Sequence, residues 1–267
     1  LLPLADGLGR ITGDARALPD FLICGAQRSG TTSLFRSLCQ HPSVTGPTLR
    51  KGVHFFDTGY HRDLNRYRSY FPLRATLRGR RVVESSPYYL FHPLAAERIG
   101  RDLPDVRVVV ILRDPVERAY SAHAHETARG FETEPFARAV ELEEGRLAGE
   151  EERLAADPGY RSHSHQHHGY VARGHYVDQL TRMEKHLGRD RMHVVDHADL
   201  FDGTTAALSR IERFLGLPDG PGVAPGKHNA RARATMPEGL RAELAARFAD
   251  SDTRLAAWWG RTPSWCV

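Results

Sequence analysis

The sequence predicts an α/β fold, in which helices flank a central parallel sheet within a single domain spanning residues 1–267. Two observations carry this prediction. Four short apolar runs, each bounded by turn residues, are followed by segments with helical periodicity. The runs also lack a polar alternate face, which is typical of strands covered by helices on both sides. They occupy residues 21–24, 81–83, 106–112 and 192–195.

The first half of the chain supplies three of these strands and an insertion. Residues up to about 19 are predicted to form an N-terminal arm, and the run 106–112 is the strongest strand because it is almost wholly apolar and rich in valine. Residues 132–157 are rich in Glu, Ala, Arg and Leu and predict an exposed helix that ends at Pro158. This helix belongs to a predicted helical and loop insertion at about 130–170.

The remaining elements follow the fourth strand. Residues 209–216 predict a helix closed by Gly216, because glycine is favoured just after a helix. The stretch at about 218–236 begins rich in glycine and proline and predicts a loop. Residues 237–259 alternate apolar and charged side chains at helical spacing, which predicts a final helix.

Composition limits the classes of function. The formal net charge of +4 suits an anionic ligand but falls short of a dedicated nucleic-acid-binding protein. Cys24, Cys39 and Cys266 cannot all pair, which favours a reducing compartment, and we expect a cytoplasmic location. Residues 1–20 lack the pattern of a secretory signal, and no apolar run approaches the roughly 18 residues of a membrane span.

A glycine-containing loop joins the first strand to a helical segment. Gly25 and Gly30 let the backbone turn tightly so that successive N–H groups face a phosphate, and the helix that follows adds its positive end. The spacing resembles a P-loop without its lysine, which disfavours ATP or GTP hydrolysis. The alternative is a polar turn that caps a helix. The candidate anion-binding residues of this P-loop-type sheet are Gln27, Arg28, Ser29, Gly30, Thr31, Thr32 and Ser33.

A second candidate anion site follows the strongest strand. Arg113 leaves the sheet at its carboxyl edge, where open α/β folds bind ligands, and Ser121 follows about two helical turns later. Together they could hold one phosphate. The alternative is an Arg–Asp start of a helix that has Pro115 at its first position.

Several short motifs are spread along the chain. They are GAQRSGTTSL at 25–34, VHFFD at 53–57, ESSPYYLF at 84–91, ILRDPVERAYS at 111–121, RGHY at 173–176, FLGL at 214–217 and Trp265. Together they resemble the motifs of the PAPS-dependent sulfotransferases, where PAPS is 3′-phosphoadenosine 5′-phosphosulfate. The nearest branch holds the heparan sulfate N- and O-sulfotransferases and their bacterial relatives, and the resemblance covers nearly the whole chain. It implies an enzyme that transfers a sulfuryl group to a hydroxyl or amine of a glycan or small molecule.

The resemblance also implies roles for particular residues. The loop 25–33 would hold the 5′-phosphosulfate, Arg113 and Ser121 the 3′-phosphate, and Tyr176 would help to line the nucleotide site. The late basic stretch KHNARAR would close over the cofactor, with a solvated basic turn as the alternative. Its candidate phosphate contacts are Lys227, Arg231 and Arg233.

Three positions depart from the pattern of these relatives. Arg28 stands where lysine is common in the phosphate loop, so it would stabilise charge without donating a proton. Gly52 stands where the glycosaminoglycan enzymes carry glutamate as the proposed base, and Ser85 where a lysine is frequent. Lys51 could supply the missing cation or be a surface lysine. These departures leave open a catalytically impaired module that binds PAPS or its product PAP, 3′-phosphoadenosine 5′-phosphate, and a P-loop small-molecule kinase.

A general base must then come from elsewhere. His54 is the first candidate because it titrates near neutrality and its neighbours Phe55 and Phe56 would partly desolvate it. A structural histidine is the alternative. Glu84, at a strand end, is the second candidate, with a cap on Ser86 or a salt bridge to Arg28 as alternatives. Arg28 would be the electrostatic part of the catalytic set.

The histidine-rich stretch 162–168 and the acceptor are less informative. In an extended segment His163, His165 and His167 would share one side, as in some zinc sites, but sulfuryl transfer requires no metal and we predict none. A substrate-facing or plainly exposed loop is the favoured interpretation. Neither the acceptor nor an oligomeric state is predicted from the sequence.

Overall fold

The structure is a computed structural model that describes residues 12–48, 50–220, 226 and 235–267. Its centre is a five-stranded sheet in which each neighbouring pair is parallel. All four predicted runs form strands, which confirms the predicted sheet. A fifth strand of two residues was not predicted, because so short a pair carries no periodicity. In spatial order the strands are β2 (Val44–Thr45), β3 (Arg81–Ser85), β1 (Phe21–Gly25), β4 (Arg107–Leu112) and β5 (Met192–Asp196).

The strand order places the phosphate loop at a switch point of the sheet. From β1 the chain continues to β2 and β3 on one side, whereas β4 and β5 lie on the other side. Open parallel sheets bind ligands beyond the carboxyl ends of their strands where the order reverses. The loop after β1 therefore begins at the position where this fold favours a ligand.

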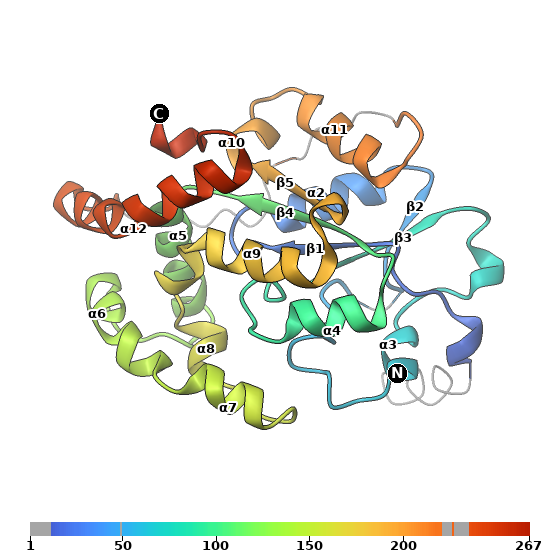
Figure 1. Cartoon of the computed structure of the whole chain (residues 1–267), viewed down its shortest axis with the longest axis horizontal. Coiled ribbons are helices and arrows are strands. Elements are labelled where there is room, and N and C mark those ends of the chain that lie inside the picture. Colours follow the sequence, from blue (N-terminus) through green and yellow to red (C-terminus); the bar gives the residue numbers. More distant parts are fainter. Residues whose placement is uncertain (1–11, 49, 221–225, 227–234) are drawn as a thin grey trace.

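One face of the sheet is covered by α4 (Ala95–Asp102), α9 (Tyr176–Leu187) and α12 (Glu238–Trp259). Leu22 and Val108 of the two central strands pack here in one continuous apolar cluster. The helix α12 agrees with the predicted tail helix at 237–259, and Figure 1 shows α4 and α9 lying side by side across this face.

The opposite face is covered by α2 (Thr31–Cys39), α10 (His197–Leu200) and α11 (Ala206–Leu215). Ile23 packs on this face, so consecutive residues of β1 are buried on opposite sides. This burial explains why the run carries no polar alternate position. The C-terminal glycine of α11 has a positive φ of 68°, as the sequence predicted for Gly216.

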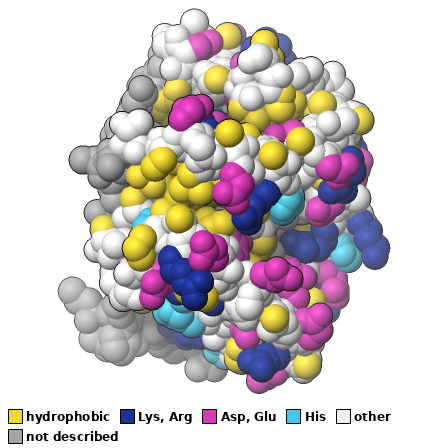
Figure 2. All heavy atoms as spheres, turned by 90° about the vertical axis from the view of Figure 1, so that its left-hand side faces the viewer, with side chains coloured by type: hydrophobic (Ala, Val, Ile, Leu, Met, Phe, Trp, Pro, Cys, Tyr) yellow, Lys and Arg dark blue, Asp and Glu magenta, His cyan; other side chains and the backbone are white. Residues whose placement is uncertain are grey.

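A third apolar cluster joins α5 (Pro115–Thr127), α6 (Phe136–Leu147) and α12 at one side of the molecule. Acidic and basic side chains are interspersed on that side, and hydrophobic side chains gather on one part of it (Figure 2). The prediction of a single exposed helix over 132–157 is wrong. The chain breaks at Gly149, whose φ is 74°, and a separate helix α7 (Glu150–Ala156) follows.

The prediction for 132–157 failed because several of its glutamates are buried in hydrogen bonds. Glu132 accepts from Arg146 and from the Tyr170 hydroxyl, and Glu143 accepts from the backbone N–H groups of Val171 and Ala172. A sequence pattern rich in glutamate suggests a solvated face, whereas here the carboxylates fix the neighbouring chain.

The histidine-rich stretch forms a short helix, α8 (His163–His167), and not the extended segment that the zinc-like spacing required. In an α-helix, two residues that are two positions apart point about 200° apart around the helix axis. His163, His165 and His167 therefore do not share one side. The stretch is also not a plainly exposed loop, because it is helical and His165 is 1% exposed. The alternative of a substrate-facing segment stays a prediction.

The remaining elements are short. They are α3 (Leu64–Arg68) and the 3₁₀ turns Gly13–Ala15, Arg74–Thr76, Ala172–Gly174, Arg189–Arg191 and Ser264–Cys266. Most of the predicted arm at 1–19 and of the predicted closing loop at 218–236 lies outside the described residues. Within the described part of the chain, no helix combines the length and apolarity needed to cross a membrane.

Candidate active site

A pocket of about 480 Å³ opens at the carboxyl edge of the sheet. Its walls include residues that follow four strands by one or two positions: Gln27 after β1, Pro87 after β3, Arg113 after β4 and His197 after β5. The other described residues that line it are Arg28, Gly30, Thr31, Thr32, Ser33, Lys51, His54, Tyr88, Ser121, His125, Arg129, Gln166, His167, Arg173 and Phe201.

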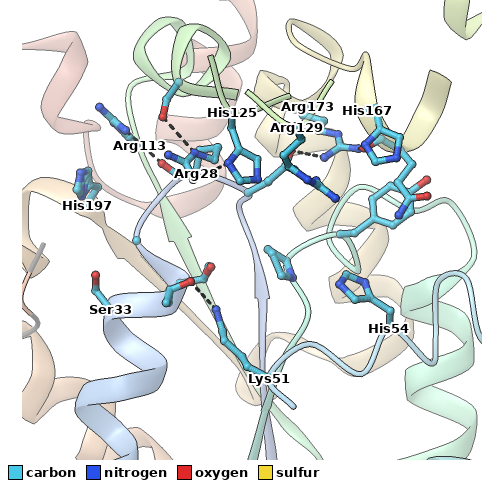
Figure 3. Close-up of a pocket in the computed structure, with 18 of the residues that line it drawn as sticks. Arg28, Ser33, Lys51, His54, Arg113, His125, Arg129, His167, Arg173 and His197 are labelled. Atoms are coloured by element: carbon cyan, nitrogen blue, oxygen red, sulfur yellow. Dashed lines mark hydrogen bonds between the residues drawn. The ribbon is translucent and has the colours of Figure 1, made fainter. Parts of the chain in front are cut away.

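The lining of this pocket is strongly basic. Five of the described lining residues are Lys or Arg and four are His, whereas none is Asp or Glu. Clefts lined by one sign of charge concentrate ligands of the opposite sign. Figure 3 shows these side chains converging from several elements. The arrangement therefore suits a ligand with several negative charges.

The phosphate loop meets its helix at Gly30. This residue has a φ of 97°, and a Cβ atom built on it would lie 2.6 Å from the Phe201 ring, so both conformation and space require glycine. Gly30 is the N-cap of α2 and supplies no side-chain acceptor to the first turn. Because first-turn N–H groups lack intrahelical partners, this end of α2 is suited to binding an anion.

Arg28 and Ser121 lie together, as do Arg28 and Arg113. The Arg28 Nε donates to Ser121 Oγ at 3.2 Å, and Arg113 Nη1 donates to the Arg28 carbonyl at 3.2 Å. Arg28 has a φ of 68°, a conformation rare for a residue with a side chain. Asp114 also caps α5 by accepting from Val116 N, so the predicted Arg–Asp helix start and the pocket position of Arg113 coexist.

Tyr176 and Ser29 lie behind the pocket wall. Tyr176 is fully buried and does not line the pocket; its hydroxyl donates to the Arg113 carbonyl at 2.7 Å. Burial raises the pKa of this phenol well above its ordinary value, so the hydroxyl keeps its proton. Ser29 is fully buried too.

The candidates Lys227, Arg231 and Arg233 lie outside the described residues.

His54 lines the pocket and pairs with a buried carboxylate. Its Nδ1 lies 2.7 Å from Asp57 Oδ2, and its side chain is 35% exposed while that of Asp57 is fully buried. Burial alone would lower the pKa of His54, but the Asp57 carboxylate outweighs it and raises that pKa above its ordinary value. The backbone φ of His54 is 56°, so two of the pocket's candidate residues, His54 and Arg28, hold left-handed conformations.

The aromatic neighbours of His54 pack in the core and do not line the pocket. Phe55 and Phe56 point into the core, where the Phe55 ring stacks on Tyr67 at 4.7 Å between centroids. The Phe55 N–H donates to the Tyr89 hydroxyl at 2.9 Å.

Glu84 lies beneath the pocket and does not line it. It is fully buried, and its Oε1 accepts from Ser86 Oγ at 2.5 Å and from Val53 N at 3.2 Å. Burial raises the pKa of this carboxyl despite those hydrogen bonds. The contact with Ser86 is the one that the capping alternative predicted, and it disfavours Glu84 as the group that meets an acceptor.

Lys51 reaches the pocket from the segment after β2. Its Nζ donates to Thr32 Oγ1 at 2.7 Å, in the first turn of α2 (Figure 3). Burial lowers the pKa of Lys51 to about 8. Of the two alternatives for this residue, the structure supports a cation in the pocket.

The sequence interpretation missed the far side of the pocket. His125 and Arg129 follow Ser121 at intervals of four residues along and just beyond α5, so helical spacing from Ser121 could have found them. His167 comes from the stretch whose helix was not predicted, and no local pattern marks it. Arg173 begins the RGHY motif, but the sequence interpretation gave it no role in the site. Among the described residues, no group of three or more His, Cys, Asp or Glu is placed to hold a metal ion.

A glycine-containing loop between a buried strand and a helix, at the switch point of a parallel sheet and within a basic pocket, defines a P-loop-like anion-binding protein. A family model described as "Sulfotransferase domain" matches residues 18–226. The chain belongs to the sulfotransferase family. The resemblance that the motifs predicted is thereby confirmed.

Individual relatives agree with this assignment. The crystal structure of a sulfotransferase from Alicyclobacillus acidocaldarius superposes with a TM-score of 0.70 at 32% identity, covering 92% of this chain and 97% of that one. The human bifunctional heparan sulfate N-deacetylase/N-sulfotransferase 2 is 28% identical over 205 residues, which are 75% of this chain and 22% of the relative. Human heparan sulfate glucosamine 3-O-sulfotransferase 6 is 41% identical over 123 residues, 46% of this chain and 33% of the relative. The chain thus spans about a fifth to a third of these two curated relatives.

Proposed function

We propose that this protein transfers a sulfuryl group from PAPS to a hydroxyl or amine of a glycan or small-molecule acceptor and releases PAP. The observation that carries the proposal is the phosphate-loop pocket whose described lining contains five Lys or Arg and no carboxylate. PAPS carries negative charge at both its 5′ and 3′ ends. A pocket with cations at separated positions matches such a ligand better than it matches a single phosphate.

The donor would lie between the phosphate loop and the start of α5. The loop and the N-terminus of α2 would hold the 5′-phosphosulfate, and Arg113 with Ser121 would hold the 3′-phosphate. The contacts of Arg28 support this placement, because Arg28 belongs to the loop and yet donates to Ser121. Tyr176 would act behind them as a positioning residue, since it fixes the Arg113 carbonyl.

His54 would accept the proton of the acceptor. With the Nδ1 proton held by Asp57, the lone pair resides on Nε2, which is the tautomer that a base requires. A Cβ atom built on Gly52 would lie 3.4 Å from His54 Nε2. The imidazole therefore occupies space beside the position at which the glycosaminoglycan enzymes carry their glutamate.

The reaction would be an in-line displacement at sulfur. The acceptor oxygen or nitrogen forms a bond to sulfur, the bond from sulfur to the 5′-phosphate oxygen breaks, and its electron pair stays on PAP. The acceptor proton passes to His54 Nε2, and Asp57 stabilises the imidazolium. Positioning and charge stabilisation supply most of the rate in such transfers.

Transfer of ³⁵S from labelled PAPS to a panel of acceptors tests this function. The panel would include N-desulfated heparin oligosaccharides, simple amino sugars and phenols, with PAP release measured in parallel. We expect label on at least one acceptor class. Tight PAP binding with no transfer to any of them would instead support the impaired binding module. The predicted cytoplasmic location stays a prediction that this assay does not address.

A further inference from the structure

Lys51 occupies an unusual electrostatic position. Its ammonium group donates to Thr32 in the first turn of α2, which is the positive end of the helix macrodipole. Within the described residues, no carboxylate forms an ion pair with Nζ, although the buried Glu84 favours the ammonium from a greater distance, and the nearby Arg36 disfavours it. Lys51 is half-buried at the pocket wall, and this partial burial outweighs the effect of Glu84 and of the Cys39 thiol and lowers the pKa of the ammonium to about 8.

This arrangement costs stability in the absence of a ligand. A cation at a helix N-terminus is unfavourable, and a partly buried charge whose acidic neighbour Glu84 is too distant for an ion pair adds to that cost. The Thr32 hydroxyl satisfies one donor but carries no charge. A negatively charged group bound at the phosphate loop would offset both costs. It would form an ion pair with the ammonium and accept hydrogen bonds from the N–H groups at the start of α2.

The arginine of the loop lies toward a different part of the pocket. Arg28 Nε donates to Ser121 Oγ, and Arg28 Nη1 lies 3.5 Å from His125 Nδ1. Ser121 and His125 both belong to α5. In Figure 3, Arg28 lies with His125 on one side of the pocket, whereas Lys51 rises from the other side toward the loop. The two cations thus reach the loop region from separate elements.

We propose that Lys51 binds the 5′-phosphosulfate of the donor and stabilises the charge that develops on the leaving 5′-phosphate. This proposal rests on the proposed function. It assigns the cation that stabilises the leaving group to the segment after β2. In the step, the bond between sulfur and the 5′-phosphate oxygen breaks and both electrons remain on that oxygen. Lys51 stays protonated throughout and changes partner from Thr32 to the phosphate.

The test compares the wild type with Lys51→Met, Lys51→Arg and the control Lys185→Met, an exposed lysine of α9 outside the pocket. The first measurement is calorimetric PAP affinity at pH 7. We expect Lys51→Met to weaken PAP by on the order of 10- to 100-fold, the effect of one charge-assisted hydrogen bond. Lys185→Met should bind as the wild type does. Equal affinity of wild type and Lys51→Met would overturn the proposal.

The second measurement is the melting temperature without ligand. Because the half-buried ammonium at the helix end destabilises the empty site, Lys51→Met should melt no lower than the wild type at pH 7. A purely structural lysine would make the variant melt lower. The sign of the pH effect follows from the lowered pKa: between about pH 8 and 10 the unfolded chain holds more protons on Lys51, so the wild type gains stability relative to Lys51→Met as pH rises.

The third measurement separates failure of this proposal from failure of the donor assignment. Wild-type PAP affinity should fall as pH rises from 7 to 9.5, whereas Lys51→Arg should keep its affinity, because a guanidinium stays charged. Inorganic phosphate serves as a second probe by thermal shift. If the wild type ignores PAP but binds phosphate only when Lys51 is present, the donor is wrong and the role of Lys51 as an anion-binding cation stands.

Discussion

His54 Nδ1 lies 2.7 Å from the buried Asp57 Oδ2, and this pair links the pocket surface to the interior. The carboxylate fixes one tautomer of the imidazole and stabilises its protonated form. A pair of this kind is suited to accept a proton and hold it for a short time. Asp57 ends the VHFFD motif, so the partner of His54 was already visible in the sequence three residues further on.

Replacement of His54 by alanine should remove the base and leave the donor site nearly unchanged. We expect the transfer rate to fall by on the order of 10²–10⁴, with PAP affinity changed no more than a few-fold. Radiolabel transfer and calorimetry measure the two quantities on the same preparation. A rate equal to that of the wild type would exclude His54 from proton transfer.

The pH dependence of transfer should report the same pair. A base must be neutral, and the pKa of His54 is raised, so the rate should climb with pH through a midpoint above 6.5. Asp57→Asn removes the carboxylate that raises this pKa, so its midpoint should move to lower pH while the maximal rate falls. A midpoint that does not move in Asp57→Asn would contradict the coupling of the two residues.

The contribution of His54 to folding stability should fall as pH rises, whereas the transfer rate should rise. Because the folded pKa is raised above the unfolded value, the pair stabilises the fold at low pH, and that stabilisation is lost as pH rises through the folded pKa. The difference in melting temperature between the wild type and His54→Ala should therefore shrink from pH 5.5 to pH 8. A difference that grows over this interval would show that the imidazole is not stabilised as a cation.

Arg113→Ala should lower the preference for a 3′-phosphate. The variant is expected to weaken PAP by on the order of 10- to 100-fold while weakening adenosine 5′-phosphosulfate much less. Arg129→Ala provides a matched control, because it removes another cation from the same pocket. That control should weaken both ligands to a similar degree. Equal losses for both ligands in Arg113→Ala would make Arg113 a structural residue.

Tyr176→Phe tests positioning from behind the pocket wall. Loss of the hydrogen bond to the Arg113 carbonyl should cost about 1 kcal/mol of stability and should weaken PAP more than adenosine 5′-phosphosulfate. Chemical denaturation and calorimetry provide the two readouts. If the variant loses stability but keeps the full preference for PAP, then Tyr176 supports the fold without orienting Arg113.

Gly30→Ala tests the close approach within the phosphate loop. The new Cβ would meet the Phe201 ring in addition to the strain of a positive φ. Gly79→Ala is a matched control with a φ of 81° and no atom within 4 Å of its Cβ, so it isolates the conformational cost. Gly30→Ala should lose more stability than the control and should also lose PAP affinity. Similar losses in both variants would show that the space beside Phe201 is not limiting.

Much of the fold was accessible from local patterns, because strands covered on both faces appear as uninterrupted apolar runs. The run 106–112 is the clearest example, and the loop from Gly25 to Ser33 followed from its glycines and hydroxyls. The two-residue strand β2 and the break at Gly149 were missed. The strand β2 is too short to carry a periodic signal. The break at Gly149 has a local cause, because its φ of 74° favours glycine, and no other atom lies within 4 Å of the position of a Cβ there.

The site was predicted well where its residues follow strands and poorly where they come from the insertion. Arg113 and His54 lie in motifs attached to the sheet, and both line the pocket. His167 reaches the pocket from α8, inside the insertion. Glu84 does not line the pocket, and its carboxyl accepts hydrogen bonds from Ser86 and Val53. Such long-range contacts cannot be inferred from spacing along the chain.

The most direct test of the proposed donor is calorimetric titration of the wild-type protein with PAP and, in parallel, with ADP plus magnesium. The basic pocket, with no carboxylate among its described lining residues to hold Mg²⁺, predicts tight binding of PAP and weak or no binding of ADP with magnesium. A preference for ADP with magnesium would contradict the sulfuryl donor and favour a kinase. Failure to bind either ligand would contradict the nucleotide site itself.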